Sequence, residues 1–378
     1  MNARERLLAT INFQPVDRPF RWETPSAWPS TIARWLGEGM PREVLKDFYR
    51  MQSVLGFDTM RWLPLGTWVR EPWTPPFPYK ILEDEGENMV ISDIDGVVKR
   101  IRSDKSDMSM PQFLQFPVET MEDYLTKIEH RLDCDNPSHF DEKWHTLVKE
   151  YSEDRDFPVG MWVIGPFGHL RNLFGDENLM YALYDEPEMI HYIMQKWKEF
   201  YIGFLKNVCR DVTPDFIMIW EDNCFKGGPL CSPDMFREFM FEPLCEVVQA
   251  AKELGIAGIF VDTDGDCNLM IPIYVEAGVN GFYPFECQAG MDIREIRKQY
   301  GKQFVIIGGI EKLMLSDDYT EEDMKREVRE KVVPMLKDGG YIPMLDHSAP
   351  PNISYNRFCT FLEYVRGLGA DSGNESVE

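Results

Sequence analysis

The sequence lacks any long apolar run. No window of the 378 residues approaches the roughly 18 consecutive apolar residues of a membrane-spanning helix, so no membrane protein is expected. The N-terminal segment MNARERLLATINF is charged and amphipathic, unlike a secretory signal peptide. The eight cysteines form no CxxC pair and are expected to be mostly buried thiols. These absences predict a cytoplasmic protein.

Positive charge is also scarce. Lys and Arg number 40 against 64 Asp and Glu, which gives a net charge of −24. Nucleic acids require a basic surface, so a nucleic-acid partner is excluded, and the simplest role of the charge is to keep the protein soluble. Hydrophobic residues make up 44% of the chain, enough for a large core.

The stretch 258–312 contains three short apolar runs, GIFVDTDGD, VNGFYPFEC and QFVIIGGIE, separated by two segments with helical spacing. This alternation indicates buried parallel strands in βαβ units. Similar runs along the chain give strand candidates near residues 20, 58, 160, 218, 260, 282, 306 and 343. Eight strands with intervening helices predict an α/β fold of the (β/α)8 TIM-barrel type.

Other segments are predicted to surround this barrel. Asn2 to Asn12 has the spacing of a helix and forms an N-terminal extension. The stretch YKILEDEGENMVISDIDGVVKRIRSD alternates apolar and polar residues between turn signals, which predicts an antiparallel β excursion inserted into the barrel. No linker divides the chain, so residues 1–368 form one predicted domain, followed by a disordered tail at 369–378.

Four helical regions are also predicted. The stretch 118–153 is charged and helical. A later helical stretch is predicted as two helices that are separated near Asp185–Pro187. A further helix covers Pro233–Leu254, with Ser232 as its N-cap, and another covers Glu321–Lys337.

Acidic residues follow several predicted strands. Carboxylates at the C-terminal ends of parallel strands share one mouth, where barrels keep their chemistry. Any one of them could instead cap the next helix, but a cluster at one face needs a cation, shared protons or a polar substrate to offset its repulsion. The candidates are Glu221, Asp222, Asp262, Asp264, Glu286, Glu311 and Asp346.

His347 is the most informative single residue because it ends the last predicted strand. A histidine at the barrel mouth serves as a general acid, an oxyanion donor or a metal ligand. His169, just after the third strand, is the only other histidine expected near the mouth.

Tryptophan is concentrated at the start of the chain. Loop tryptophans could line a pocket for a flat apolar ligand, or they could pack as a lid over the barrel. Six precede residue 74, namely Trp22, Trp28, Trp35, Trp62, Trp68 and Trp73.

Several longer segments resemble the uroporphyrinogen decarboxylase (URO-D) superfamily. They are NARERLLATINFQPVDRPF, EDNCFKGGPLCSPDMFREFM, the DTDGD to IIGGIEK region, and GGYIPMLDHSAPPNISYNRFCTFLEYVR. The resemblance implies a (β/α)8 barrel and two kinds of enzyme: cofactor-free porphyrinogen decarboxylases, and zinc-dependent methyltransferases that serve corrinoid proteins.

The chain departs from the decarboxylase pattern. The Arg-Gln-Ala-Gly-Arg motif after the first strand is replaced by FRWETPSAWPS, and the aspartate after the second strand has no counterpart in TMRWLPLG. The family's tyrosine after the third strand falls near Asn172, and only the late histidine matches, at His347. Without that arginine pair, an acidic mouth would repel the carboxylates of a porphyrinogen.

The chain also departs from the methyltransferase pattern. The family's His-x-Cys pair falls on Asp262 and Asp264, and its later cysteine falls at about Asp346. Zinc accepts carboxylate and imidazole ligands, so the resemblance implies a candidate zinc site of Asp262, Asp264, Glu221 and His347.

The resemblance therefore implies a methyltransferase of a corrinoid-dependent demethylation system. It would move a methyl group to a corrinoid protein from a small molecule that is methoxylated, with aromatic donors included, or N-methylated. A homodimer is a candidate assembly. The alternatives are a decarboxylase of a porphyrinogen-like or other carboxylated substrate, and a non-catalytic ligand-binding barrel. The catalytic candidates are His347, Glu221 and Asp264, and the substrate-binding candidates are Trp22, Trp28, Trp62, Asn172 and Glu286.

Overall fold

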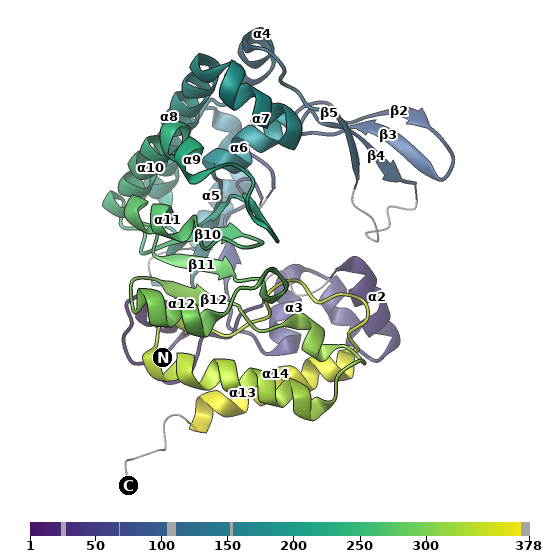
Figure 1. Ribbon diagram of the computed structural model, residues 1–378, viewed down its shortest axis with the longest axis vertical. Helices are drawn as coiled ribbons and strands as arrows, with labels where there is room; N and C mark the ends of the chain where they lie inside the picture. Colours follow the sequence, from purple (N-terminus) through teal and green to yellow (C-terminus); the bar gives the residue numbers. More distant parts are fainter. Residues whose placement is uncertain (24–27, 68, 104–110, 152–153, 372–378) are drawn as a thin grey trace.

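A curved parallel sheet of seven strands forms the centre of the computed structural model (Figure 1). The structure describes residues 1–23, 28–67, 69–103, 111–151 and 154–371. The strand order is β1-β6-β7-β10-β11-β12-β13, and every neighbouring pair is parallel. The predicted α/β barrel is confirmed. Its strands are β1 (Arg61–Trp62), β6 (Val159–Ile164), β7 (Phe216–Trp220), β10 (Gly258–Thr263), β11 (Gly281–Pro284), β12 (Val305–Ile307) and β13 (Tyr341–Ile342).

The eighth barrel position differs from the prediction. The chain near residue 20 forms no strand in its described part, and Thr24 lies outside the described residues. The carbonyl oxygen of Arg21 accepts a hydrogen bond from the amide of Asp58 at 2.9 Å. On the other side, the Glu23 carboxylate accepts one from the amide of Leu345 at 3.1 Å. At this edge a side-chain hydrogen bond takes the place of the backbone hydrogen bonds between paired strands, so no regular strand forms.

Alternate residues of the strands fill the barrel interior. Glycines make room for the largest rings: a Cβ atom on Gly160 would lie 2.4 Å from the ring of Phe216, and one on Gly281 would lie 2.3 Å from that of Phe260. Phe20 and Trp22 belong to the same set, although they lie outside the hydrogen-bonded strands. The other buried members are Met60, Met218, Tyr283, Val305, Ile307, Ile342 and Met344.

Helix α1 (Ala3–Ile11) closes the end of the barrel opposite the mouth. Asn2 caps it through a capping box with Glu5. Leu7 and Ile11 pack into the barrel interior, and a Cβ atom on Gly258 at the start of β10 would lie 3.2 Å from Ile11 Cδ1. The predicted N-terminal extension is therefore the floor of the barrel.

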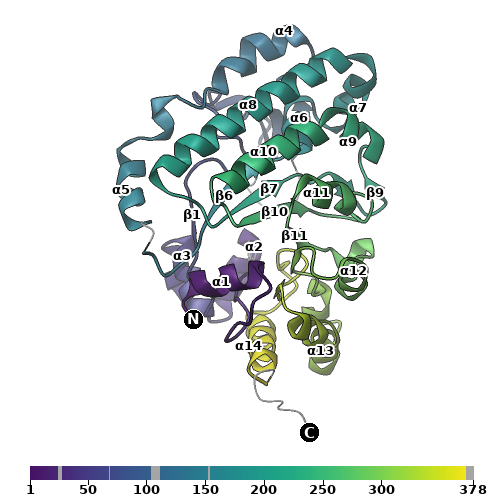
Figure 2. The same cartoon turned by 90° about the vertical axis from the view of Figure 1, so that its left-hand side faces the viewer.

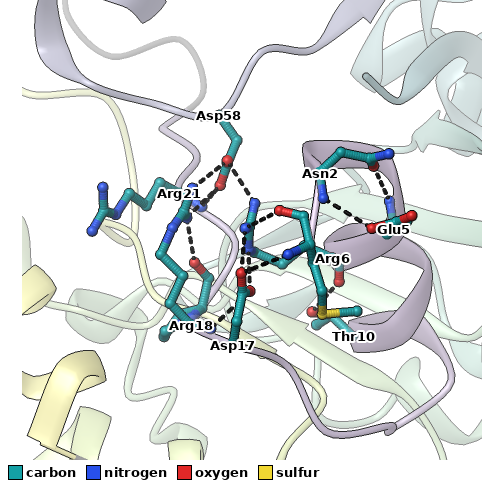
Figure 3. Close-up of polar contacts among 10 residues, drawn as sticks. Asn2, Glu5, Arg6, Thr10, Asp17, Arg18, Arg21 and Asp58 are labelled. Atoms are coloured by element: carbon teal, nitrogen blue, oxygen red, sulfur yellow. Dashed lines mark hydrogen bonds and ion pairs between the residues drawn. The ribbon is translucent and has the colours of Figure 1, made fainter. Parts of the chain in front are cut away.

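A buried ion network ties α1 to the chain that enters β1 (Figure 3). Asp58 accepts hydrogen bonds from Arg6 Nη1 at 2.9 Å, from Arg18 Nη2 at 2.6 Å and from the backbone amide of Arg21 at 2.8 Å. Arg6 also pairs with Asp17, with Nε 2.8 Å from Oδ1. The side chains of Arg6 and Asp58 are both only 5% exposed. The buried Arg6–Asp58 pair of this network therefore fixes α1 to the segment that leads into β1.

Helices cover the outside of the sheet. The long α8 and α10 lie side by side against one part of it, and α13 and α14 lie together near the C-terminus (Figure 2). No helix of the described chain is long and apolar enough to cross a membrane. The other helices are α2 (Pro29–Gly37), α3 (Phe48–Leu55), α4 (Met121–Asp123), α5 (Glu142–Glu150), α6 (Pro166–Phe174), α7 (Asp176–Asp185), α8 (Pro187–Asp211), α9 (Pro233–Phe239), α10 (Phe241–Glu253), α11 (Ile271–Ala277), α12 (Ile293–Tyr300), α13 (Glu321–Asp338) and α14 (Tyr355–Asp371).

Three of the predicted helix details are confirmed. The break near Asp185–Pro187 separates α7 from α8, because a proline suits the first turn of a helix. Ser232 caps α9, since its Oγ accepts a hydrogen bond from the amide of Met235 at 3.2 Å. The predicted helix 321–337 corresponds to α13.

Other helix predictions need correction. Gly175 adds a break between α6 and α7, where φ is 74° and a Cβ atom would lie 2.2 Å from the ring of Phe116. The helix predicted over 233–254 divides at Met240 into α9 and α10. In place of one helix over 118–153, the described part holds short helical turns and α5. Helix α14 runs beyond the predicted domain boundary at 368, and the rest of the tail lies outside the described residues.

The predicted β excursion is confirmed as a four-stranded antiparallel sheet in the order β2-β3-β4-β5. It projects from the barrel beside α6 and α7 (Figure 1). The prediction covered three of its strands, and the fourth follows them. The strands are β2 (Lys80–Asp84), β3 (Asn88–Ser92), β4 (Val98–Arg102) and β5 (Gln112–Gln115).

Candidate active site

Asp222 after β7 and Asp262 and Asp264 at the end of β10 lie close enough at the C-terminal end of the barrel for their charges to interact. Asp262 alternates with Phe260 along β10, so its side chain points into the barrel. Burial raises the pKa of Asp262 well above its ordinary value, and the charges of Asp264 and Asp222 raise it further. The side chain stays partly accessible at the mouth. Asp262 therefore holds its proton to a higher pH than an ordinary aspartate does.

Asp264 and His347 form an ion pair across the mouth. Nε2 of His347 lies 3.5 Å from Oδ2 of Asp264, and the two side chains are 31% and 36% exposed. Burial alone lowers the pKa of His347, but the hydrogen bond and charge of Asp264 outweigh it, so the pKa is raised above its ordinary value. Nδ1 of His347 is buried and has no hydrogen-bond partner among the described residues. Asp264 therefore favours the charged form of an imidazole that is partly exposed at the mouth.

Glu221 points away from this pair. Its Oε2 accepts hydrogen bonds from the amides of Phe167 at 2.9 Å and Gly168 at 3.1 Å, at the start of α6. A Cβ atom on Gly165 would lie 2.3 Å from the carboxyl carbon, so this glycine permits the contact. Burial raises the pKa of Glu221 to about 8. Glu221 thus anchors α6. It does not join Asp264 and His347, with which it was predicted to form the catalytic site.

The residues proposed for zinc do not fit a metal site in this arrangement. The described chain holds no group of three or more His, Cys, Asp or Glu side chains placed to bind a metal ion. The reason is that the Glu221 carboxylate is engaged by the amides of Phe167 and Gly168 at the start of α6. Asp264 and His347 remain the only two of the four shown in contact among the described residues. No catalytic step is therefore derived through zinc.

Asp222 is held at the mouth by Arg171 of α6. Arg171 Nη1 donates to the carbonyl oxygen of Asp222 at 3.0 Å and forms an ion pair with its carboxylate. Burial raises the pKa of Asp222 to about 6, although Arg171 opposes the shift. The backbone of Asp222 has a φ of 44°, which is rare for a residue with a side chain. Asp222 can therefore exchange a proton close to neutral pH.

Glu286 and Asp346 hold the loops on the other side of the mouth. Glu286 Oε1 lies 3.4 Å from Lys312 Nζ, and its Oε2 accepts from the amide of Gly265 at 3.2 Å. Asp346 is fully buried and accepts from the amides of Lys312 at 3.0 Å and Cys287 at 2.9 Å. Asp346 thus ties together the loops after β11, β12 and β13. Glu286 lies on the loop beside Asp264, and its substrate-binding role stays a prediction.

The tryptophans do not form one lid. Trp22 is only 3% exposed and lies in the barrel interior, with its ring centroid 6.4 Å from that of Trp62. Trp62 in turn stacks on Trp162 at 4.7 Å. These contacts favour packing over ligand binding for Trp22 and Trp62. Trp28, just before α2, is half-buried, and Trp68 lies outside the described residues.

Asn172, the remaining substrate-binding candidate, lies on α6 and lines a separate cavity beside the loop after β1. None of the mouth residues above contributes to its lining. Its Nδ2 lies 3.4 Å from the carbonyl oxygen of Val69. The structure therefore divides the predicted site residues between two places at the same end of the barrel.

Sequence reasoning missed several buried ionisable groups. Burial raises the pKa of Glu23 to about 8, although its hydrogen bond from the amide of Leu345 opposes the shift. Glu71 accepts hydrogen bonds from His169 Nδ1 and from the hydroxyl of Tyr201, both at 2.6 Å. No periodicity marks these residues, because all of them are buried by segments distant in the sequence.

Together, the fold and the mouth define a parallel α/β barrel with an acidic C-terminal end at which a histidine pairs with an aspartate. The family model for uroporphyrinogen decarboxylase (URO-D) matches residues 105–368. The chain therefore belongs to the URO-D family. No curated protein sequence matches it.

Solved structures support the fold. A methyltransferase from Methanosarcina mazei superposes with a TM-score of 0.61 over 97% of this chain and 98% of its own, at 14% sequence identity. At that identity the likeness concerns the fold alone. Xylanase B from Clostridium stercorarium F9 gives a TM-score of only 0.31 over 54% of this chain and 71% of its own, at 11% identity, and carries no argument.

Proposed function

We propose that this protein is a methyltransferase that moves a methyl group from a methoxylated or N-methylated small molecule to a corrinoid protein. The observation that carries the proposal is the Asp264–His347 pair at the open end of the barrel, in which the carboxylate favours the charged form of the imidazole. Membership of the URO-D family and the likeness to the Methanosarcina mazei methyltransferase are consistent with it.

The chemistry explains why a proton donor is needed. A methyl ether is a poor methyl donor because the oxygen departs as an alkoxide or phenoxide. The corrinoid supplies the nucleophile that accepts the methyl group. As the bond between the methyl carbon and the oxygen breaks, the imidazolium of His347 can protonate the leaving oxygen, and Asp264, which faces Nε2, stabilises the imidazolium beforehand. General acid catalysis of this kind contributes about 10² to 10⁴-fold.

The role of His347 depends on the class of methyl donor. A quaternary ammonium compound leaves as a neutral amine, so its demethylation needs no proton from the enzyme. An ether needs one. Activity that depends on His347 therefore indicates a methoxylated donor, whereas activity independent of His347 indicates a quaternary amine.

The decisive experiment combines the purified protein with a Co(I) corrinoid protein and a panel of methoxylated aromatics and methylated amines. Formation of methyl-cobalt is followed by its absorbance. We expect methyl transfer from at least one methoxylated compound, lowered at least about 10²-fold by His347→Gln. His145→Gln, on the exposed face of α5, is the matched control and should retain the wild-type rate.

Other outcomes would assign another function. Release of CO2 from a porphyrinogen or another carboxylated compound, without methyl transfer, would identify a decarboxylase. Binding of a small ligand without turnover of any compound would identify a non-catalytic barrel. Either result would contradict the proposal.

A further inference from the structure

A cavity of about 280 Å³ lies outside the acidic mouth, between the barrel and the inserted sheet. Its walls come from four separate parts of the chain: the loop after β1, the turn between β3 and β4, the short helical turn Pro137–His139, and Asn172 of α6. The insert joins the barrel beside α6 in this region (Figure 1). The volume is just below the roughly 300–1,000 Å³ of common small-molecule sites, which suits a molecule built on a single ring.

The apolar part of the lining is flat and rigid. Trp73 is largely buried there, and prolines form much of the remaining apolar surface. Rigid flat walls favour a planar ring over a flexible chain, because little side-chain entropy is lost on binding. The other apolar lining residues are Pro64, Leu65, Val69, Pro72, Pro76 and Ile94.

The charged residues of the lining are already paired within the protein. Glu71 is bound by His169 and Tyr201, as described above. Arg70 Nη2 lies 3.3 Å from Asp93. Asp95 lies 3.6 Å from Lys99 Nζ. Because each of these charged groups already has a hydrogen-bond or ion-pair partner within the protein, a charged ligand would lose its hydration without gaining a free counter-ion.

Neutral hydrogen-bonding groups remain to orient a ligand. The indole N–H of Trp73 is buried and has no partner within the described part of the chain. Asn172, Thr74 and Ser138 add an amide and two hydroxyls to the same lining. Burial lowers the pKa of His139, which keeps that ring neutral near pH 7. A buried donor without a partner is costly, so an oxygen acceptor on the ligand would remove that cost.

From this lining we infer that the cavity binds an uncharged single-ring molecule that carries hydroxyl or ether oxygens. Its ring lies against Trp73 and the prolines, and one oxygen accepts the indole N–H. Methoxylated phenols belong to this class. The cavity lies apart from His347 and Asp264, so the inference concerns a binding site beyond the proposed function, and binding is measured without methyl transfer.

Isothermal titration without any corrinoid protein tests the inference. The probes are 4-methoxyphenol, which is neutral, 4-methoxybenzoate, an anion, and 4-methoxybenzylamine, a cation. We expect one-to-one binding of the neutral probe and at least tenfold weaker binding of both charged probes. Absence of saturable binding of 4-methoxyphenol, or tighter binding of either charged probe, would overturn the inference.

Two variants locate the binding site. Trp73→Phe keeps the ring but removes the N–H, and should weaken binding of 4-methoxyphenol about threefold to tenfold. Asn172→Trp fills the cavity and should abolish binding. Asn178→Ala, on the exposed side of α7, is the control and should bind like the wild type. Circular dichroism and thermal unfolding verify that the variants fold. Wild-type affinity in both folded cavity variants would place the ring elsewhere and refute the inference.

The two proposals can fail separately. If 4-methoxyphenol binds as expected but no donor yields methyl-cobalt, the proposed function fails and the cavity inference stands. If a methoxylated compound yields methyl-cobalt but Trp73→Phe and Asn172→Trp both bind 4-methoxyphenol like the wild type, the cavity inference fails and the proposed function stands.

Discussion

Nε2 of His347 lies 3.5 Å from Oδ2 of Asp264, although the two residues follow strands that are not neighbours in the sheet. Strands β11 and β12 separate β10 from β13. The contact therefore crosses the barrel mouth, and it forms because the sheet curves. It brings a carboxylate to the histidine that the sequence singles out, and it raises the pKa of that histidine.

The first prediction concerns the pH dependence of methyl transfer. The acid form of His347 exists below its raised pKa, so kcat/KM should fall as the pH rises through that pKa. Asp264→Asn removes the carboxylate that raises the pKa, so the fall should move to lower pH. The measurement is a kcat/KM profile between pH 5 and 10 for both proteins.

Asp266→Asn is the control for this profile, because Asp266 lies on the same loop and contacts Asn268. Its alkaline limb should coincide with that of the wild type. A profile unchanged in Asp264→Asn would show that His347 is not the acid that limits the rate.

The second prediction concerns the effect of pH on stability. Burial raises the pKa of Glu23 from its ordinary 4.5 to about 8. Between these values the folded protein keeps a proton that the unfolded chain releases, so the free energy of unfolding falls as the pH rises from about 4.5 to 8. Glu23→Gln keeps an acceptor for the amide of Leu345 but cannot ionise. Over this pH range we expect the variant to retain stability that the wild type loses, on the order of a few kcal/mol in the free energy of unfolding.

Denaturant unfolding at pH 5 and pH 8 measures this effect. The Glu23→Gln variant should gain stability relative to the wild type between the two pH values. The exposed Glu295→Gln on α12 should show the same pH dependence as the wild type. Parallel curves for Glu23→Gln and the wild type would contradict the buried, protonated state of Glu23.

The third prediction separates the members of the proposed zinc set. Because amides of α6 occupy the Glu221 carboxylate, Glu221→Gln should leave the affinity for added zinc unchanged. Zinc titration with a competing chelator gives the affinity. A loss of tenfold or more in Glu221→Gln, equal to that in Asp264→Asn, would restore the four-ligand site that the resemblance implied.

The fourth prediction concerns the ion network beneath the barrel. Asp58→Asn leaves the guanidinium of Arg6 without one buried counter-charge, and should lower the free energy of unfolding by roughly 3 kcal/mol. The exposed pair of Arg237 and Glu276 is the matched control. Glu276→Gln should cost less than about 1 kcal/mol in the same denaturant experiment. Equal losses in the two variants would show that burial does not strengthen the network.

Local patterns in the sequence predicted most of the barrel. Seven apolar runs became the parallel strands, because a strand covered by helices must be apolar on both faces. The stretch from residue 79 became an antiparallel sheet, as its apolar–polar alternation between turn signals predicts. The position of His347 after the last strand followed from counting those runs.

The sequence by itself determined which residues reach the end of the barrel, because strand order and polarity follow from local periodicity. Only the tertiary structure decided which way each side chain points and what it contacts. Glu221 and Asp264 both follow strands, yet amides of α6 hold the first and His347 pairs with the second. Glu23 was not found at all, since its burial depends on Leu345 at the other end of the chain. Such contacts depend on the curvature of the whole sheet, which no local pattern encodes.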